Sequence, residues 1–163
     1  MTNNQVNYFS ETNKEKWNKL HKKKVYVINT QWNDSIIKSL TDKTVELLNF
    51  AGFTDHEIVT VAGAYEIPYM ASLLAKKDPK CAIVTLGCVI KGETYHFNAI
   101  VDAVSENLMN VSIKTGVPIA FGVLTVNNEE QAKARSGDNE FNKGLEATAA
   151  LLDLIETIQI RGL

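Results

Sequence analysis

Four short runs of apolar, β-forming residues, each followed by a helical pattern, constrain the fold of this chain more than any other feature. The runs cover residues 25–29, 57–61, 81–86 and 118–124. Continuous apolar runs of this length are typical of strands that are buried on both faces of a sheet. Because strands that alternate with helices form βα units, their sheet is parallel. The sequence therefore predicts an α/β fold, a three-layer αβα sandwich around a four-stranded parallel sheet.

Apolar residues at helical spacing mark the segments between these runs. The clearest stripe, which Gly116 closes, is formed by Phe97, Ile100, Val101, Val104, Leu108 and Val111. Further helices are expected over residues 36–47, 65–77 and 145–155, and a short one after Asn128. Pro68 is compatible with its helix only in the first turn.

Composition excludes several classes of protein. The chain has 163 residues and a net charge of −2, which fits one domain and gives no electrostatic footprint for nucleic acid. No apolar run approaches the roughly 18 residues of a membrane span. The two cysteines, Cys81 and Cys88, are too few for a disulfide framework and lack the spacing of a zinc site. We therefore expect a cytoplasmic protein without a metal, a nucleic-acid partner or a membrane partner.

The first 24 residues differ from the rest of the chain. They are polar and end in the basic run Lys22-Lys23-Lys24. Such an arm can bind nucleic acid or an anionic membrane, but little aromatic interleaving favours a solvated tail. A short helix between Ser10 and His21 is an alternative. The predicted boundary separates a polar basic arm, residues 1–24, from a domain of residues 25–163.

Ligands of open parallel sheets bind at the carboxyl ends of the strands, so the strand-to-helix loops are the segments to search. Trp32 in the first loop is either a lid over the sheet edge or a stacking platform for a flat ligand. Glu66 in the second either favours the helix dipole or accepts hydrogen bonds from a ligand. Gly87 and Gly92 bracket the third loop, as in phosphate cradles.

The third loop also contains His96. It is not a nucleotide P-loop, because Glu93-Thr94 stands where Lys and Ser/Thr are required. His96 begins a helix, where the dipole favours a neutral imidazole that can exchange protons near neutral pH. A structural histidine that caps the helix is the alternative. Arg135, before a glycine break, is either an anion ligand or a solvated surface residue.

Taken together, these loops resemble the 6,7-dimethyl-8-ribityllumazine synthase family. The resemblance rests on residues 64–68 (AYEIP), 87–97 (GCVIKGETYHF), 121–125 (FGVLT) and 142–144 (NKG). It runs collinearly from about residue 25 to the end of the chain. Any one motif is weak, whereas four in the same order and spacing are specific.

The resemblance implies an enzyme of riboflavin biosynthesis, a transferase with a flavodoxin-like fold. The family condenses 5-amino-6-(D-ribitylamino)uracil with L-3,4-dihydroxy-2-butanone 4-phosphate and releases 6,7-dimethyl-8-ribityllumazine, phosphate and water. It uses neither a metal nor an organic cofactor. The resemblance also implies a homo-oligomer, a pentamer or a multiple of it.

Family motifs assign the site residue by residue. His96 matches the proton-transfer residue, and Trp32 stands where the family usually has phenylalanine, as the platform for the pyrimidine. Glu93, Thr94 and Arg135 match the phosphate-binding positions, and Phe121 is expected to flank the heterocycle from a neighbouring subunit. The remaining substrate-binding positions hold the ring and the ribityl chain, and they are Ala64, Tyr65, Glu66, Cys88, Val89 and Ile90.

Two other hypotheses are consistent with the sequence. A binding module that holds a flavin or lumazine without chemistry would keep Trp32 but would not need His96. A structural or regulatory paralogue would keep the fold with a decayed site. Incubation with the two substrates, followed by lumazine absorbance, separates all three.

Overall fold

The computed structural model describes residues 6–163. Its strands are β1 (Val25–Thr30), β2 (His56–Val61), β3 (Ala82–Ile90) and β4 (Ile119–Val126). Its helices are α1 (Glu11–Asn18), α2 (Asp34–Phe50), α3 (Ile67–Lys77), α4 (His96–Thr115), α5 (Glu129–Ala134) and α6 (Lys143–Arg161), and a 3-10 turn, η1 (Ala64–Glu66), precedes α3. All the strand pairs are parallel, in the order β2-β1-β3-β4. The predicted strands and helices are confirmed, and β3 extends four residues further than predicted.

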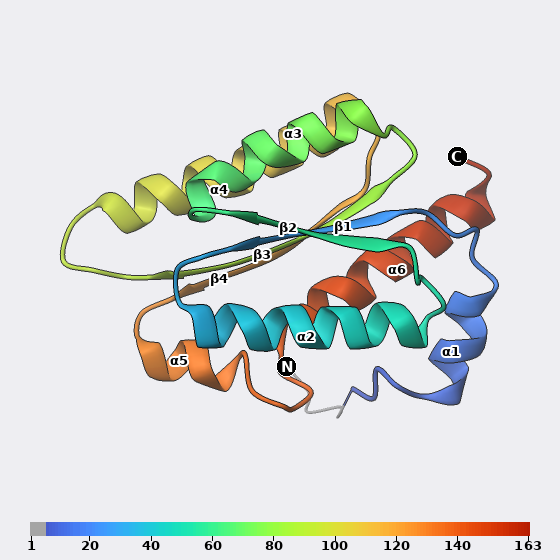
Figure 1. Ribbon diagram of the computed structural model, residues 1–163, viewed down its shortest axis with the longest axis horizontal. Helices are drawn as coiled ribbons and strands as arrows, with labels where there is room; N and C mark the ends of the chain where they lie inside the picture. The colour runs from blue at the N-terminus through green and yellow to red at the C-terminus, as the bar shows by residue number, and fades with distance from the viewer. Residues whose placement is uncertain (1–5) are drawn as a thin grey trace.

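The sheet lies between two helical layers (Figure 1). α3 and α4 cover one face, whereas α2, α5 and α6 cover the other. Successive side chains of a strand point to opposite faces, so Val27 belongs to the core under α2 and α6, and Ile28 to the core under α3 and α4. The predicted three-layer sandwich, a flavodoxin-like arrangement, is therefore confirmed.

The strand order places a topological switch point between β1 and β3. The chain leaves β1 for β2 on one side and then returns to place β3 on the other side. Loops that leave neighbouring strands in opposite directions open a crevice at their carboxyl ends. Here Asn33, just after β1, donates its side-chain N–H to the carbonyl of Cys88 on β3 over 3.2 Å. This hydrogen bond ties the two strand ends together.

One close approach fixes α6 against α2. A Cβ at Gly144 would meet the Leu40 carbonyl oxygen and lie 2.9 Å from the Thr44 hydroxyl oxygen. Both atoms belong to α2, so only glycine lets the two helices approach this closely. The Asn-Lys-Gly motif therefore has a packing role as well as any functional one.

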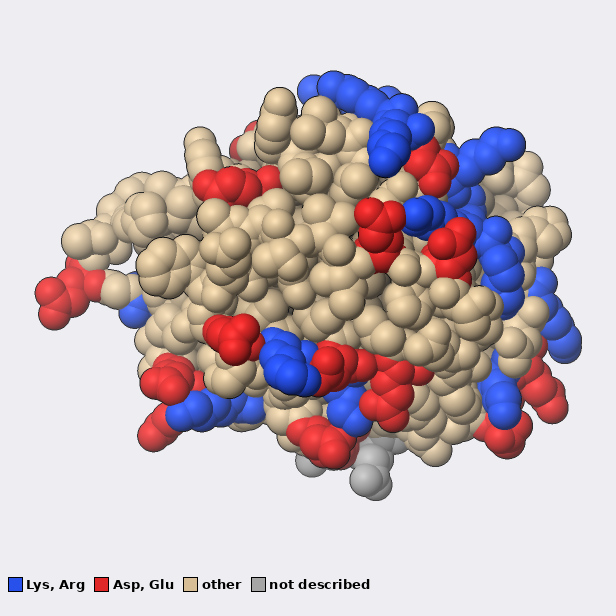
Figure 2. All heavy atoms as spheres, in the orientation of Figure 1, with Lys and Arg blue, Asp and Glu red and all other residues tan. Residues whose placement is uncertain are grey.

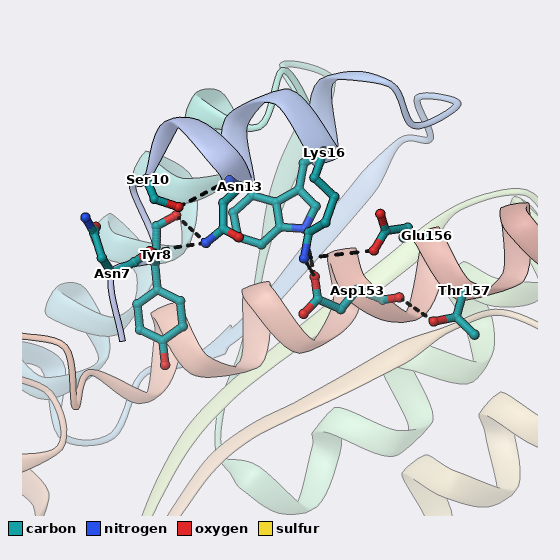
Figure 3. Close-up of polar contacts among 9 residues, drawn as sticks. Asn7, Tyr8, Ser10, Asn13, Lys16, Asp153, Glu156 and Thr157 are labelled. Atoms are coloured by element: carbon teal, nitrogen blue, oxygen red, sulfur yellow. Dashed lines mark hydrogen bonds and ion pairs between the residues drawn. The ribbon is translucent and has the colours of Figure 1, made fainter. Parts of the chain in front are cut away.

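The N-terminal arm is packed against the domain, and the expectation of a solvated tail is wrong for residues 8–24. Trp17 of α1 is 1% exposed. Its indole N–H donates to Asp153 of α6 over 2.8 Å (Figure 3). The Lys22 ammonium donates to the carbonyls of Trp17 and Ala51, so this lysine secures the arm. Residues 1–5 of the predicted arm lie outside the described residues, and the boundary at residue 25 stays a prediction.

Charged side chains interleave on the face shown in Figure 2. Positive and negative groups alternate along its lower margin, and basic groups gather at its right-hand side. Over residues 6–163, no helix combines the length and apolar character that crossing a bilayer requires.

Candidate active site

Trp32 and the η1 turn form one wall at the carboxyl end of the sheet. Trp32 is 72% exposed, and a Cβ at Gly63 would lie 3.4 Å from the Trp32 ring. The ring therefore rests beside the turn and leaves most of its surface open. Glu66 accepts a hydrogen bond from the Gly63 N–H over 2.9 Å, so one of its oxygens supports the turn. The other oxygen remains available to a ligand.

Tyr65 lies in the same turn but points elsewhere. Its side chain lines a shallow groove of about 360 Å³ between α3 and α4, together with Tyr69 and Asn107. The part of Ala64 and Tyr65 in substrate binding stays a prediction.

The third loop is shorter than predicted. Gly87 was expected to open a phosphate cradle, but residues 87–90 belong to β3 and pair with β4. A Cβ at Gly87 would lie 3.1 Å from Val123, so this glycine permits strand packing. The loop itself begins at Lys91. The prediction of a phosphate cradle between Gly87 and Gly92 is therefore wrong at Gly87, which lies within β3.

Cys88, Val89 and Ile90 end β3 beside the switch point. Burial raises the pKa of the Cys88 thiol to about 11. The thiol is therefore neutral at physiological pH, and thiolate chemistry is not available at this position. What these residues offer a ligand is their backbone.

His96 lies where the sequence predicts it, at the start of α4. Glu93, Thr94 and His96 are all exposed. The His96 N–H donates to the Thr94 hydroxyl oxygen over a long 3.4 Å. Glu66 follows β2 and His96 follows β3, and these strands are parallel, so both residues lie beyond the carboxyl end of the sheet. Figure 1 shows this loop projecting beyond the ends of the other strands.

Phe121 and Arg135 lie in a separate place. Both line a cavity of about 970 Å³ beside the edge strand β4. Neither Trp32, Glu66 nor His96 lines it. The structure thus divides the predicted site residues into two groups, which we call the His96 group (residues 32, 64–66, 88–90 and 93–96) and the Arg135 group (residues 121 and 135).

Arg135 is held in place through its backbone and one guanidinium N–H. Its carbonyl accepts from the Lys143 N–H over 2.8 Å, and Nη1 donates to the Gln131 carbonyl over 3.2 Å. The other N–H groups remain free for an anion. Buried Asn142 donates to the carbonyls of Ser136 and Gly137, which fixes the turn behind the arginine.

Most of the residues that line this cavity were not predicted as site residues, and Lys143, Phe141 and Tyr8 are among them. Lys143 lies in the quoted Asn-Lys-Gly motif, which was the only signal for it. Phe141 and Tyr8 also line the cavity. Lys143 pairs with Glu146 over 2.7 Å, so a cation and a carboxylate stand side by side in the cavity wall. No sequence pattern linked Tyr8 to this place, because it comes from the opposite end of the chain.

A metal centre has no support in this part of the chain. Within residues 6–163, no group of three or more His, Cys, Asp or Glu side chains comes together in a way that would hold a metal ion.

Comparison with known proteins identifies the family of this fold and these loops. The family model for 6,7-dimethyl-8-ribityllumazine synthase matches residues 22–159. The chain belongs to the 6,7-dimethyl-8-ribityllumazine synthase family. That match contains all the motifs quoted above, so the resemblance is confirmed. The role of each site residue stays a prediction.

Three relatives of that name show how far the similarity extends. The protein from Leuconostoc mesenteroides is 40% identical over 139 residues, covering 84% of this chain and 89% of the relative. The protein from Buchnera aphidicola is 39% identical over 142 residues, with 85% and 89% covered. The protein from Mycolicibacterium gilvum is 40% identical over 135 residues, with 82% and 84% covered. The similarity therefore spans most of this chain and most of each relative.

Proposed function

We propose that this chain condenses 5-amino-6-(D-ribitylamino)uracil with L-3,4-dihydroxy-2-butanone 4-phosphate to give 6,7-dimethyl-8-ribityllumazine. The observation that carries the proposal is the family match over residues 22–159, which includes an exposed histidine and an exposed tryptophan in two of the strand-to-helix loops. The pyrimidine amine attacks the ketone and water leaves. Phosphate is then eliminated, and the second amine closes the ring with loss of another water.

The His96 group suits the pyrimidine and its proton transfers. Trp32 offers an open indole face on which a flat ring can stack. Glu66 keeps one oxygen for a ring N–H, since its other oxygen holds the Gly63 N–H. His96 takes and returns protons during imine formation and cyclisation, a role that contributes on the order of 10²- to 10⁴-fold. Alignment of the two substrates supplies much of the remaining acceleration.

The Arg135 group suits the phosphate and the far side of the heterocycle. The free N–H groups of Arg135 match a phosphate in charge and geometry. Glu93 and Thr94 are the other phosphate-binding positions of the proposal, although they belong to the His96 group. A phosphate that reaches both Thr94 and Arg135 therefore requires the two groups to meet.

We infer that they meet between two copies of the chain. In a ring, the His96 group of one subunit faces the Arg135 group of the next, a head-to-tail contact that closes as a pentamer or a multiple of it. Large exposed apolar side chains on α4 support such a contact, since Met109 is 61% and Ile113 is 73% exposed. Both cysteines are free thiols, and we place the enzyme in the cytoplasm without a metal or organic cofactor.

The test is direct. Purified protein is incubated with both substrates, and the appearance of lumazine absorbance is followed against a reaction without protein. Catalysis above that background supports the proposal. Lumazine binding without catalysis would favour a binding module, and neither binding nor catalysis would favour a paralogue with a decayed site.

A further inference from the structure

The N-terminal arm delivers one side chain to the cavity of the Arg135 group. Tyr8 lines that cavity together with Phe121, Arg135 and Lys143. The neighbouring Phe9 is not part of the cavity lining and packs edge-on against Phe50 of α2, with ring centroids 5.2 Å apart. The two aromatic residues therefore have different tasks: Phe9 anchors the arm, and Tyr8 turns toward the cavity.

A set of hydrogen bonds fixes the backbone that carries Tyr8. The Asn13 amide donates to the carbonyls of Asn7 and Tyr8, each over 3.2 Å (Figure 3). Ser10 caps α1 by accepting from the Asn13 N–H. The position of Tyr8 is thus set by the first turn of α1.

α1 is in turn fastened to α6. Trp17 and Lys16 both donate to Asp153 over 2.8 Å. Nearer the end of the arm, the His21 N–H donates to the Gln159 side chain over 2.7 Å. The arm runs along α6 from the cavity toward the far end of that helix. Contacts along the arm therefore hold the segment that carries Tyr8.

The phenol itself is left for another partner. Among residues 6–163, none forms a hydrogen bond with the Tyr8 hydroxyl, and Figure 3 shows this hydroxyl pointing away from the arm. Burial, followed by the nearby Glu146 carboxylate, raises the pKa of Tyr8. The hydroxyl therefore remains protonated and can both donate and accept.

The charged side chains around Tyr8 indicate which group of the substrate its hydroxyl binds. Glu146 lies near Tyr8 and pairs with Lys143. A phosphate dianion next to the Glu146 carboxylate would be repelled, whereas Arg135 offers it a better place. Neutral polyol hydroxyls, which donate and accept, match the combination of phenol, carboxylate and ammonium.

We propose that Tyr8 is a substrate-positioning residue, carried by the N-terminal arm, whose phenol binds the hydroxyls of the ribityl chain in the cavity of the Arg135 group. The inference rests on the proposed function for its substrate. It assigns to the arm a part in the site that the family domain alone does not contain.

The experiment compares Tyr8→Phe with Tyr26→Phe. Both remove one tyrosine hydroxyl and keep the ring, but Tyr26 is buried near the amino-terminal end of β1, away from the cavity. Steady-state rates give KM for each substrate. Fluorescence titration gives Kd for two ligands, 6,7-dimethyl-8-ribityllumazine and 6,7-dimethyllumazine, which lacks the ribityl chain.

Tyr8→Phe should raise KM for ribitylaminouracil and Kd for ribityllumazine about 3- to 10-fold, the effect of one lost neutral hydrogen bond. kcat, KM for the ketone phosphate and Kd for 6,7-dimethyllumazine should stay within about twofold of the parent, because only the ribityl contact is lost. Tyr26→Phe should change none of these values.

Three outcomes would overturn the proposal: unchanged ribityllumazine binding in Tyr8→Phe, equal weakening of both lumazines, or the same weakening in Tyr26→Phe. A parent protein that makes no lumazine contradicts the proposed function instead. In that case the two titrations still decide whether Tyr8 recognises the ribityl chain.

Discussion

The His96 group and the Arg135 group are built in different ways. The first lies at the carboxyl ends of β1, β2 and β3, where Trp32 and His96 are exposed. The second lines a cavity of about 970 Å³ between β4, α5, α6 and the N-terminal arm. One half thus presents reactive side chains on an open surface, and the other presents a concave wall that is itself partly open to solvent.

This difference indicates which tasks each group performs in the proposed site. A site must exclude water from the reacting atoms for its electrostatic contacts to be strong. The His96 group cannot do this alone, since nothing in the described chain covers it. The Arg135 group supplies a concave wall but no general acid or base of the histidine type. Each half therefore has what the other lacks, and substitutions in the two halves should have different kinetic signatures.

The largest effect is expected in the open half. His96→Ala should lower kcat about 10- to 1000-fold without abolishing turnover, because positioning survives when proton transfer is lost. Rates of lumazine formation at saturating substrates measure it. His56→Ala, at the start of β2 near the amino-terminal end of the sheet, is the control and should match the parent. A His96→Ala variant as fast as the parent would remove His96 from the mechanism.

Substitution of Arg135, in the cavity, should change KM and not kcat. Arg135→Ala should raise KM for the ketone phosphate about 10- to 100-fold, since a charge-assisted bidentate contact is lost. Lys133→Ala removes a cation from α5, two residues before Arg135, but Lys133 pairs with Glu129 and does not line the cavity, so it should leave KM unchanged. If Arg135→Ala moved only the KM for the pyrimidine, the phosphate assignment would be wrong.

Mixing two impaired variants tests whether the halves meet between subunits. At a ketone phosphate concentration well below the raised KM, Trp32→Ala and Arg135→Ala should each have little activity, yet together they should form mixed rings. With random mixing, an intact Trp32 faces an intact Arg135 at about a quarter of the interfaces. Activity should therefore return to about that fraction of the parent.

Native mass spectrometry must first show that the co-expressed chains share rings. Co-expression of Trp32→Ala with the unsubstituted chain is the control, because it shows how much activity a mixed ring has when only one of its two chains is substituted. Mixed rings without recovered activity would contradict a site shared between subunits, because both residues would then belong to one chain's own site.

The sequence predicted the regular elements well, because their patterns are strong and local. Apolar runs gave the four strands, and Gly116, with a φ of 72°, ended α4 as predicted. The prediction failed at Gly87 for a physical reason. A glycine that makes room for Val123 within a sheet looks the same in sequence as a glycine that opens a loop.

The arm and the cavity could not be predicted from local patterns. α1 has only 8 residues and one buried side chain, Trp17, so its order depends on α6 and not on its own periodicity. The cavity joins Tyr8 to Phe121 and Lys143, which are far apart in the chain. The motifs identified the chemical groups of the site, whereas tertiary packing decided which of them share a wall.

The smallest effect is expected when Trp32 is replaced by another aromatic residue. Trp32→Phe retains an aromatic face at this position. An aromatic pair is worth about 0.5–1.5 kcal/mol beyond the area that it buries, and phenylalanine can form such a pair with the pyrimidine as well. Because an exposed ring loses little packing when replaced, we expect KM for ribitylaminouracil to change by about threefold or less, with kcat preserved.

Fluorescence sharpens this prediction, because the chain has only two tryptophans. Trp32 is 72% exposed and Trp17 is 1% exposed, so acrylamide should quench the former and spare the latter. Bound ribityllumazine should protect Trp32 from acrylamide, and Trp32→Phe should remove the quenchable component altogether. Equal quenching with and without ligand, at a concentration where binding is saturated, would mean that Trp32 does not cover the ring. The open half would then hold the pyrimidine through Glu66 and the end of β3 alone, and Trp32→Ala would lose its expected effect as well.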